Sequence, residues 1–244
     1  MTEPLPPATA QLWNRLEDAP QLAGFYLIGG SALALLIGHR QSEDLDLAWP
    51  GDRLPRGKLS ALLRSLEGDG WNLERDDSPA AYEEFQIAGM DLHDYQQDFI
   101  ATAPAVGPVK LSLFVPPAPL AKLLPPTGQP SATIPTLTTL FKSKALATAS
   151  RSASRDWLDL YLLLTEHGFT IDDYAATFVE LGARLNLDLG MQRLISGRLP
   201  ADDPGFASLL SAAPSVADMT QFFRSEITRW RQQLAEERLG RQEE

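Results

Sequence analysis

Hydrophobic and polar residues in the first half of the chain follow patterns that predict helices interleaved with strands. Apolar residues at helical spacing, closed by glycine, predict helices at residues 31–38 and 56–68. A short apolar run predicts a first strand in the last part of the segment 16–30. Further apolar or alternating runs predict strands at 44–49, 85–95 and 109–115. Strands and helices that alternate in this way predict an α/β (α+β) domain with a mixed sheet.

The pattern changes after a proline-rich stretch in the middle of the chain. Six of the 19 prolines lie between Pro116 and Pro130, and Pro135 follows, which indicates a linker or a long extended loop. Beyond this stretch apolar residues recur at helical spacing almost throughout, without internal repeats. We therefore predict three parts: a domain at residues 1–115, a Pro-rich linker at 116–135 and an all-helical domain at 136–244.

Composition narrows the class of protein. The 244 residues are 44% hydrophobic and 22% charged, which is ordinary for a globular protein. The sequence has no apolar run near the ~18 residues that a membrane span needs and no signal peptide at its N-terminus, so we expect a cytoplasmic protein that makes no use of a membrane. The chain has no cysteine and three histidines, so a metal ion would need mainly oxygen ligands.

The charge is unevenly distributed along the chain. The net charge of -11 argues against a protein that coats nucleic acid through its overall field. Residues 1–100 carry 7 Lys/Arg against 17 Asp/Glu, a net charge of -10, whereas residues 101–200 carry 9 against 7, a net charge of +2. Residues 136–155 contain four basic residues and no acid. An acidic first half is thus followed by a locally basic segment.

Two aspartates stand on alternate positions of the predicted strand DLDLAW. Side chains alternate between the faces of a strand, so Asp44 and Asp46 point the same way, ~7 Å apart, while Leu45 and Leu47 point into the core. Two such carboxylates can hold one divalent cation, or two cations, for phosphoryl transfer. The alternative is the solvated face of a half-buried sheet.

The turn Gly29-Gly30-Ser31 lies between a predicted strand and a predicted helix. Free backbone N–H groups and the helix dipole make such a turn a phosphate-binding site, to which the hydroxyl of Ser31 adds a donor. The alternative is a tight turn with a serine cap. Together, the turn and the acid pair on consecutive elements indicate a nucleoside triphosphate (NTP) held with Mg²⁺.

Two stretches resemble a known family. GGSALALLIGHRQSEDLDLAW resembles motif I of the nucleotidyltransferase superfamily, and most closely that of the AbiEii/AbiGii toxin family, with its glycine turn, its helix ending in Gly-His-Arg and its Asp-x-Asp strand. TLTTLFKSKALATASRSASRDWLDLYLLL (136–164) is similar to the helical signature of that family. Five residues fall on the matching positions: Lys144, Arg151, Arg155, Asp156 and Asp159.

The second stretch also has a reading from its residues alone. At helical spacing its basic residues share one side, and such a stripe can hold triphosphate oxygens. The alternative is a surface stripe in which Arg155 and Asp159 form a weak i,i+4 pair. With the acid pair present we favour a phosphate-binding cleft between the two domains.

The sequence departs from the superfamily pattern at the strand VKLSLFV. The resemblance implies a third carboxylate there, which completes the metal site and deprotonates the attacking hydroxyl, but Ser112 occupies the position. Serine is no base at neutral pH without an activator. Either two acids suffice, or another carboxylate substitutes, or catalysis is lost. Asp91 and His93, on the predicted strand 85–95, are the first substitutes to consider.

The resemblance implies a metal-dependent nucleotidyltransferase that moves a nucleoside monophosphate from an NTP to an acceptor. It further implies a bacterial toxin–antitoxin or phage-defence setting, with tRNA or another RNA as acceptor and a separately encoded antitoxin. A small-molecule nucleotidyltransferase and an inactive nucleotide- or partner-binding descendant stay open. The expected site residues are Asp44 and Asp46 for Mg²⁺, Gly30 and Ser31 for the β- and γ-phosphates, Lys144 with Arg151 or Arg155 for the remaining negative charge, and Asp156 or Asp159 to orient those cations or take the acceptor proton.

Overall fold

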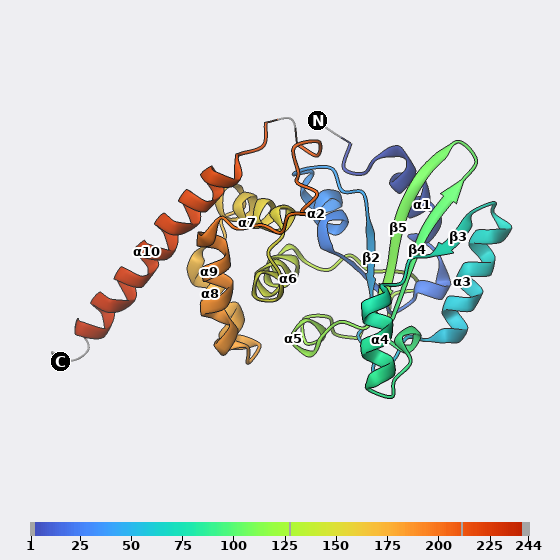
Figure 1. Cartoon of the computed structure of the whole chain (residues 1–244), viewed down its shortest axis with the longest axis horizontal. Coiled ribbons are helices and arrows are strands. Elements are labelled where there is room, and N and C mark those ends of the chain that lie inside the picture. Colours follow the sequence, from blue (N-terminus) through green and yellow to red (C-terminus); the bar gives the residue numbers. More distant parts are fainter. Residues whose placement is uncertain (1–2, 127, 211, 241–244) are drawn as a thin grey trace. The chain divides into compact units, whose positions relative to one another are not determined.

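A computed structural model describes residues 3–126, 128–210 and 212–240 of the chain (Figure 1). The chain divides into two compact units, Met1–Leu140 and Phe141–Glu244, referred to below as unit 1 and unit 2. The division falls after the proline-rich stretch, so the residues predicted as a linker, 116–135, belong to unit 1.

Unit 1 is built on a five-stranded sheet with the order β1-β2-β5-β4-β3. Only the central pair, β2 with β5, is parallel, and the other neighbours are antiparallel, so the predicted mixed sheet is confirmed. The strands are β1 (Tyr26–Ile28), β2 (Leu45–Ala48), β3 (Asn72–Arg75), β4 (Gln96–Ala103) and β5 (Val106–Phe114).

Short helices connect and flank this sheet. α1 packs against β5 and α3 against β3, while α2 connects β1 to β2 (Figure 1). Side chains alternate between the two faces of each strand, and one face forms the core. On that face Leu45, Leu111 and Phe99 lie opposite one another and are buried. The helical elements are α1 (Pro7–Leu16), η1 (Pro20–Leu22), α2 (Gly29–Ile37), α3 (Arg56–Gly68), α4 (Pro79–Ile87), η2 (Leu92–Asp94) and α5 (Ala118–Ala121).

The strand predicted at residues 85–95 is wrong. Helix α4 occupies its first three residues, and the 3₁₀ turn η2 lies near its end. The helix begins where Ser78 caps it by accepting a hydrogen bond from Ala81 N, with Pro79 in the first turn. α4 has no buried residue, so no core contact imposes a clear apolar period on its sequence, and the alternation there was misleading.

Part of the proline-rich stretch lies along β1. Thr133 donates its backbone N–H to Phe25 O (2.9 Å) and accepts from Leu27 N (3.0 Å). These bonds extend the pairing beyond the edge of the sheet at β1. Proline is suited to this position because such an edge segment has few ladder hydrogen bonds to complete.

Helices and their connecting turns make up the described part of unit 2, as predicted. Buried aromatic residues form its core, and Phe141 stacks on Phe169 with ring centroids 4.2 Å apart. A capping box in which Thr170 and Asp173 bond reciprocally starts α8. The elements are α6 (Leu137–Ser150), which begins in unit 1, α7 (Ser154–Glu166), α8 (Ile171–Glu180), η3 (Arg184–Asn186), α9 (Leu187–Ser196) and α10 (Val216–Gly240).

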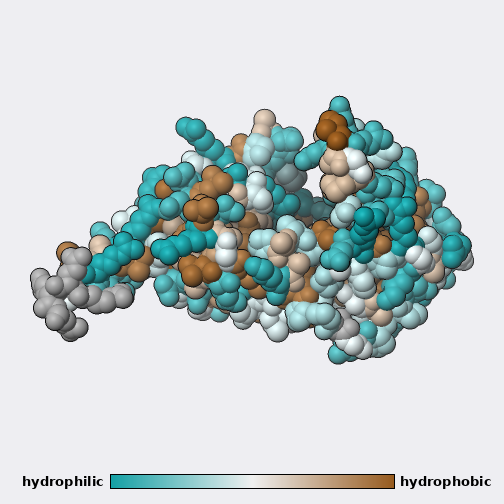
Figure 2. Space-filling view, turned by 90° about the horizontal axis from the view of Figure 1, so that it is seen from below, coloured by the Kyte–Doolittle hydropathy of each residue, from teal (hydrophilic) through white to brown (hydrophobic). Residues whose placement is uncertain are grey.

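The face of the molecule that Figure 2 shows is mainly polar. On the face seen in Figure 2, hydrophilic residues predominate and hydrophobic patches are scattered among them. Within the described ranges, none of the helices combines the length and the apolar character that crossing a membrane would take.

Candidate active site

One row of directly paired residues crosses four neighbouring strands of the sheet. Ile28 of β1 is paired with Asp46 of β2, Asp46 with Ser112 of β5, and Ser112 with Asp98 of β4. Directly paired residues point to the same face of a sheet. Asp46, Ser112 and Asp98 therefore share one face, opposite to the face of the leucine core. Sequence reasoning missed Asp98, because the strand β4 was not predicted and because Ser112, the residue paired with Asp98, lies on another strand.

The glycine turn lies directly against Asp46. Gly29 has φ +74°, and a Cβ added there would come within 2.7 Å of Asp46 Oδ2. Ser31 is buried, and its hydroxyl donates a hydrogen bond to the backbone oxygen of Asp44. The Ser31 hydroxyl thus links the start of α2 to Asp44, the residue before β2, and does not point to solvent.

The N-terminus of α2 provides backbone donors for an anion. Its N-cap residue Ile28 has no side-chain cap hydrogen bond, so the side chain at that position satisfies none of the first N–H groups of the helix. Arg40 lies next to this turn, with Nη2 2.6 Å from the position of a Cβ at Gly30. Its side chain is buried and Nη1 donates to Gln41 O (2.7 Å). Sequence reasoning assigned Arg40 no role, although the Gly-His-Arg motif pointed to it.

Alanine at Gly29 is expected to impair NTP binding more than stability. A side chain at φ +74° strains the backbone by ~1 kcal/mol or more, and the new Cβ must displace the Asp46 carboxylate. Gly38→Ala is the matched control, because Gly38 closes the same helix at φ +60° with nothing within 4 Å of an added Cβ. Thermal unfolding should show similar losses, while calorimetry with an NTP and Mg²⁺ should show weakened binding for Gly29→Ala alone. Equal binding by both variants would contradict the placement of Asp46 in the site.

Lys110 and the carboxylates near it add further charges to this face of the sheet. Lys110 lies two residues before Ser112 on β5, and its Nζ is 3.3 Å from Asp76 Oδ2. Partial burial alone would lower the pKa of Lys110, but the hydrogen bond to Asp76 and the charges of nearby carboxylates raise it. Those charges belong to Asp98, Asp76 and Asp44.

The acid pair suits Mg²⁺ by the chemistry of its donors. Carboxylate oxygens are the ligands that Mg²⁺ prefers, and the ion usually takes one or two of them together with waters and substrate phosphates. In residues 3–126, 128–210 and 212–240, no three histidine, cysteine, aspartate or glutamate side chains group into a metal site. Asp44 and Asp46 would thus hold the ion with the triphosphate as the remaining ligand.

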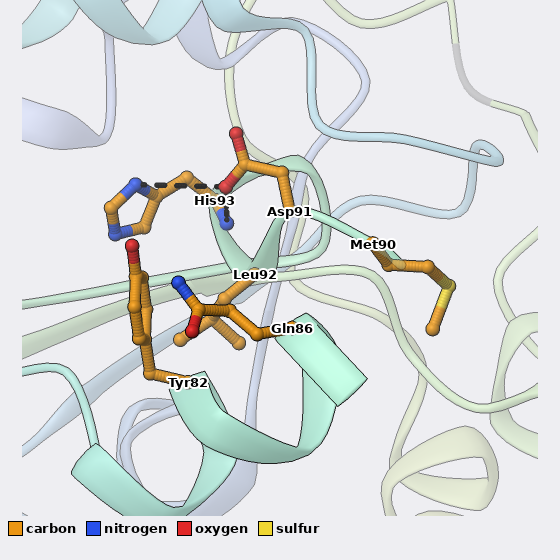
Figure 3. A pocket seen from close by; sticks show the side chains of 6 residues that line it. All are labelled: Tyr82, Gln86, Met90, Asp91, Leu92 and His93. Carbon is orange, nitrogen blue, oxygen red and sulfur yellow. Dashed lines mark hydrogen bonds and ion pairs between the residues drawn. The ribbon is translucent and has the colours of Figure 1, made fainter. Parts of the chain in front are cut away.

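The two substitutes considered for the third carboxylate lie elsewhere. Asp91 and His93 belong to η2 and its cap rather than to a strand. They line a small surface pocket of ≈ 240 Å³, in which the His93 ring lies between Asp91 and Tyr82 (Figure 3). The residues lining it are Tyr82, Gln86, Met90, Asp91, Leu92 and His93.

An ion pair accounts for Asp91 in this pocket, and a hydrogen bond accounts for His93. Asp91 is paired with Arg56, whose hydrogen bond, together with that of the His93 backbone, lowers the pKa of the Asp91 carboxyl. His93 Nε2 lies 2.8 Å from Asp77 Oδ2. Burial alone would raise the pKa of Asp77, but the hydrogen bonds from His93 and from the Asp98 backbone lower it. The cluster therefore anchors η2, and neither candidate joins the row with Asp46.

In unit 2 the helical signature forms a buried charge cluster. Lys144 Nζ of α6 lies 2.7 Å from Asp156 Oδ1 and 2.7 Å from Asp159 Oδ2, both on α7. The three residues are 6%, 3% and 0% exposed, so Lys144 is not part of a surface stripe. Burial alone raises the pKa of Asp156, but the charges of Lys144 and Arg151 outweigh it and hold that pKa below its usual value.

The two arginines of the signature have different surroundings. Arg151 Nε bonds Asp156 Oδ2 at 2.8 Å, while its side chain is 66% exposed. Arg155 Nε donates to the backbone oxygen of Gly205 (3.0 Å). In the same loop Asp203 accepts from Ser154 N (2.9 Å) and so caps α7 from 49 residues away. No local pattern in the sequence indicates this cap.

The mixed sheet and its helices have a known enzyme fold, that of the nucleotidyltransferases. A family model described as "Nucleotidyl transferase AbiEii toxin, Type IV TA system" matches residues 11–237. The chain therefore belongs to the AbiEii nucleotidyltransferase toxin family, as the two sequence motifs predicted. No curated protein sequence gives a significant match.

Two solved structures are similar to this chain at low sequence identity. MenT4, a nucleotidyltransferase toxin from Mycobacterium tuberculosis, is 14% identical with a TM-score of 0.54, over 90% of this chain and 82% of that chain. The Helicobacter pylori protein JHP933 is 16% identical with a TM-score of 0.46, over 94% and 96% of the two chains. The likeness to MenT4 supports the nucleotidyltransferase fold.

Proposed function

We propose that this chain is an active, Mg²⁺-dependent nucleotidyltransferase that transfers a nucleoside monophosphate from an NTP to an acceptor. The observation that carries the proposal is the contact between turn and acid, where Gly29 approaches Asp46 so closely that a Cβ would meet Oδ2 at 2.7 Å. Phosphates held at the N-terminus of α2 would then lie beside the carboxylates that hold the metal ion. Membership of the AbiEii family supports the reaction class.

Each group near the turn has a definite part in this reaction. The N–H groups at the start of α2 bind the β- and γ-phosphates, with Gly30 allowing close approach and Arg40 adding positive charge. Asp44 and Asp46 would hold Mg²⁺, which would neutralise charge on the triphosphate. Ser31 fixes the turn to Asp44 through its hydroxyl.

The unit 2 residues of the helical signature are proposed to bind phosphate oxygens. Arg151 has the exposed guanidinium suited to bidentate phosphate contacts. Lys144, Asp156 and Asp159 form the buried cluster that positions Arg151, because Asp156 holds its Nε. Arg155 is held by Gly205 in the same region.

The acceptor proposed for this chain is tRNA or another RNA, in a bacterial toxin–antitoxin or phage-defence setting. The type IV toxin–antitoxin family to which the chain belongs supports that setting and an antitoxin as partner. An amine-bearing small molecule is the second candidate, because the face around Asp98, Asp76 and Asp44 is acidic enough to raise the pKa of Lys110 and would attract a cation.

The proposed function predicts tight NTP binding only when Mg²⁺ is present. Without a cation, the carboxylates of Asp44 and Asp46 repel the triphosphate, whereas a Mg²⁺ held by them would offset that repulsion. Calorimetry with each of the four NTPs, in Mg²⁺ and in EDTA, measures the difference. Equal affinity in EDTA would count against the metal site.

Transfer itself is tested by mass spectrometry of the acceptors. Total bacterial tRNA and a set of amine-bearing small molecules are incubated with each NTP and Mg²⁺, and added nucleotide masses are recorded. Labelled tRNA supports the RNA acceptor, and a labelled amine supports the second candidate. No label on either, together with NTP binding, would identify an inactive nucleotide-binding descendant.

A further inference from the structure

A buried carboxylate oxygen on the sheet face lacks a hydrogen-bond donor. Asp98 is 4% exposed, and its Oδ2 accepts from Gln96 Nε2 at 2.6 Å. Its Oδ1 is buried and has no hydrogen-bond partner within the part of the chain that the structure describes. A buried acceptor left without a donor costs ~1–3 kcal/mol. An incoming hydroxyl or amine would therefore be favoured at this oxygen.

The pairing register places this oxygen in relation to the proposed metal site. Asp98 lies two strands from Asp46, with Ser112 between them in the same row. Two strand spacings put the α-carbons of the two aspartates ~10 Å apart. That separation is too wide for both to be ordinary ligands of one ion, and it leaves room for a reacting group between them.

The direction of the reaction determines from which side of Asp46 the acceptor approaches, and Asp98 lies on that side. The glycine turn adjoins Asp46 on the β1 side of the row, because Ile28 is paired with Asp46 and precedes Gly29. In an in-line displacement the acceptor attacks from the side opposite the leaving pyrophosphate. With the β- and γ-phosphates at the turn, the acceptor approaches from the β5 and β4 side, where Asp98 lies.

We infer that Asp98 is the general base of the reaction. It takes the role of the third carboxylate that the superfamily pattern has at the position of Ser112. This inference rests on the proposed function. The acceptor oxygen forms a bond to the α-phosphorus, and the bond from that phosphorus to the bridging oxygen breaks. Pyrophosphate leaves with the electron pair, and the acceptor proton passes to Asp98 Oδ1. Hydrogen bonds of this kind are often completed only in the substrate complex.

The test compares Asp98→Asn with the control Asp52→Asn. Both change a carboxylate of unit 1 to an amide, but Asp52 is exposed and lies outside the row of paired residues. The assay measures transfer of [α-³²P]NMP from each NTP to total bacterial tRNA and to amine-bearing small molecules with Mg²⁺, and calorimetry measures NTP affinity. Asp98→Asn should lower kcat by ~10²–10⁴-fold and leave the NTP Kd within ~2-fold. Asp52→Asn should leave both nearly unchanged.

A relocated carboxylate separates a base from a structural residue. Adding Ser112→Asp to Asp98→Asn places an acid one strand nearer Asp46 and should restore transfer by at least ~10-fold, because general-base catalysis is worth ~10²–10⁴-fold. A structural role for Asp98 would not be rescued in this way.

The outcomes separate this inference from the proposed function. Full activity of Asp98→Asn, or loss of NTP binding together with transfer, would overturn the role of Asp98 and leave the proposed function standing. A wild-type protein that labels neither acceptor would remove the proposed function, and the role of Asp98 with it. As a control, thermal unfolding measures whether each variant is folded.

Discussion

Replacing Asp46 by asparagine is expected to abolish nucleotide transfer. The change removes the charge of a proposed Mg²⁺ ligand next to the glycine turn, where Asp46 Oδ2 would lie 2.7 Å from a Cβ at Gly29. Charge stabilisation by a metal ion is worth several kcal/mol, so the rate should fall by at least ~10²-fold. Transfer of labelled nucleotide to total tRNA, or to whichever acceptor is labelled, measures the loss. Mg²⁺-dependent NTP binding, measured by calorimetry, should fall in parallel.

The same variant should keep its stability. Asp44 and Asp46 are like charges at alternate positions, so removal of one relieves repulsion in the metal-free protein. The melting temperature is expected to stay the same or to rise slightly. Asp52→Asn, an exposed aspartate of the same unit, is the control for loss of one negative charge. A marked drop in melting temperature for Asp46→Asn alone would show that Asp46 is a structural residue.

Replacing Lys144 by alanine is expected to destabilise the protein strongly. Its ammonium is 2.7 Å from a carboxylate oxygen of each of two buried aspartates, Asp156 and Asp159. Removing one partner of a buried ion pair leaves uncompensated charge and typically costs ~3–5 kcal/mol. Urea denaturation monitored by tryptophan fluorescence should show this loss.

Lys142→Ala is the matched control for this variant. Lys142 lies on the same helix and is also paired, with Glu180, but that pair is partly exposed to solvent. Exposed pairs contribute ~0–1 kcal/mol, so this variant should unfold close to the wild type. Similar losses for both lysines would mean that burial of the Lys144 cluster does not decide its energy. Transfer assays on folded Lys144→Ala then test whether the cluster also supports Arg151.

Much of this protein is determined by local sequence. The Gly29-Gly30-Ser31 turn, the helix that Gly38 closes and the Asp-x-Asp strand are each set by residues within one short segment. Glycine allows the positive φ angles at both ends of the helix, and alternation predicts that Asp44 and Asp46 lie on one side of the chain. Helical periodicity likewise predicted the second half, and the two motifs predicted the family that the family model shows.

Only the tertiary structure decided which distant residues share the site. Pairing register brought Asp98 of β4 into the row of Asp46, and register depends on strands that lie far apart in sequence. Burial of Lys144 between two aspartates depends in the same way on the packing of α6 against α7. The segment at residues 85–95 became helix and turn because Ser78 caps a helix that no core contact constrains. Local sequence determines the glycine turn and predicts the acid pair through backbone geometry, whereas the partners of a charged side chain follow from contacts that only the folded chain makes.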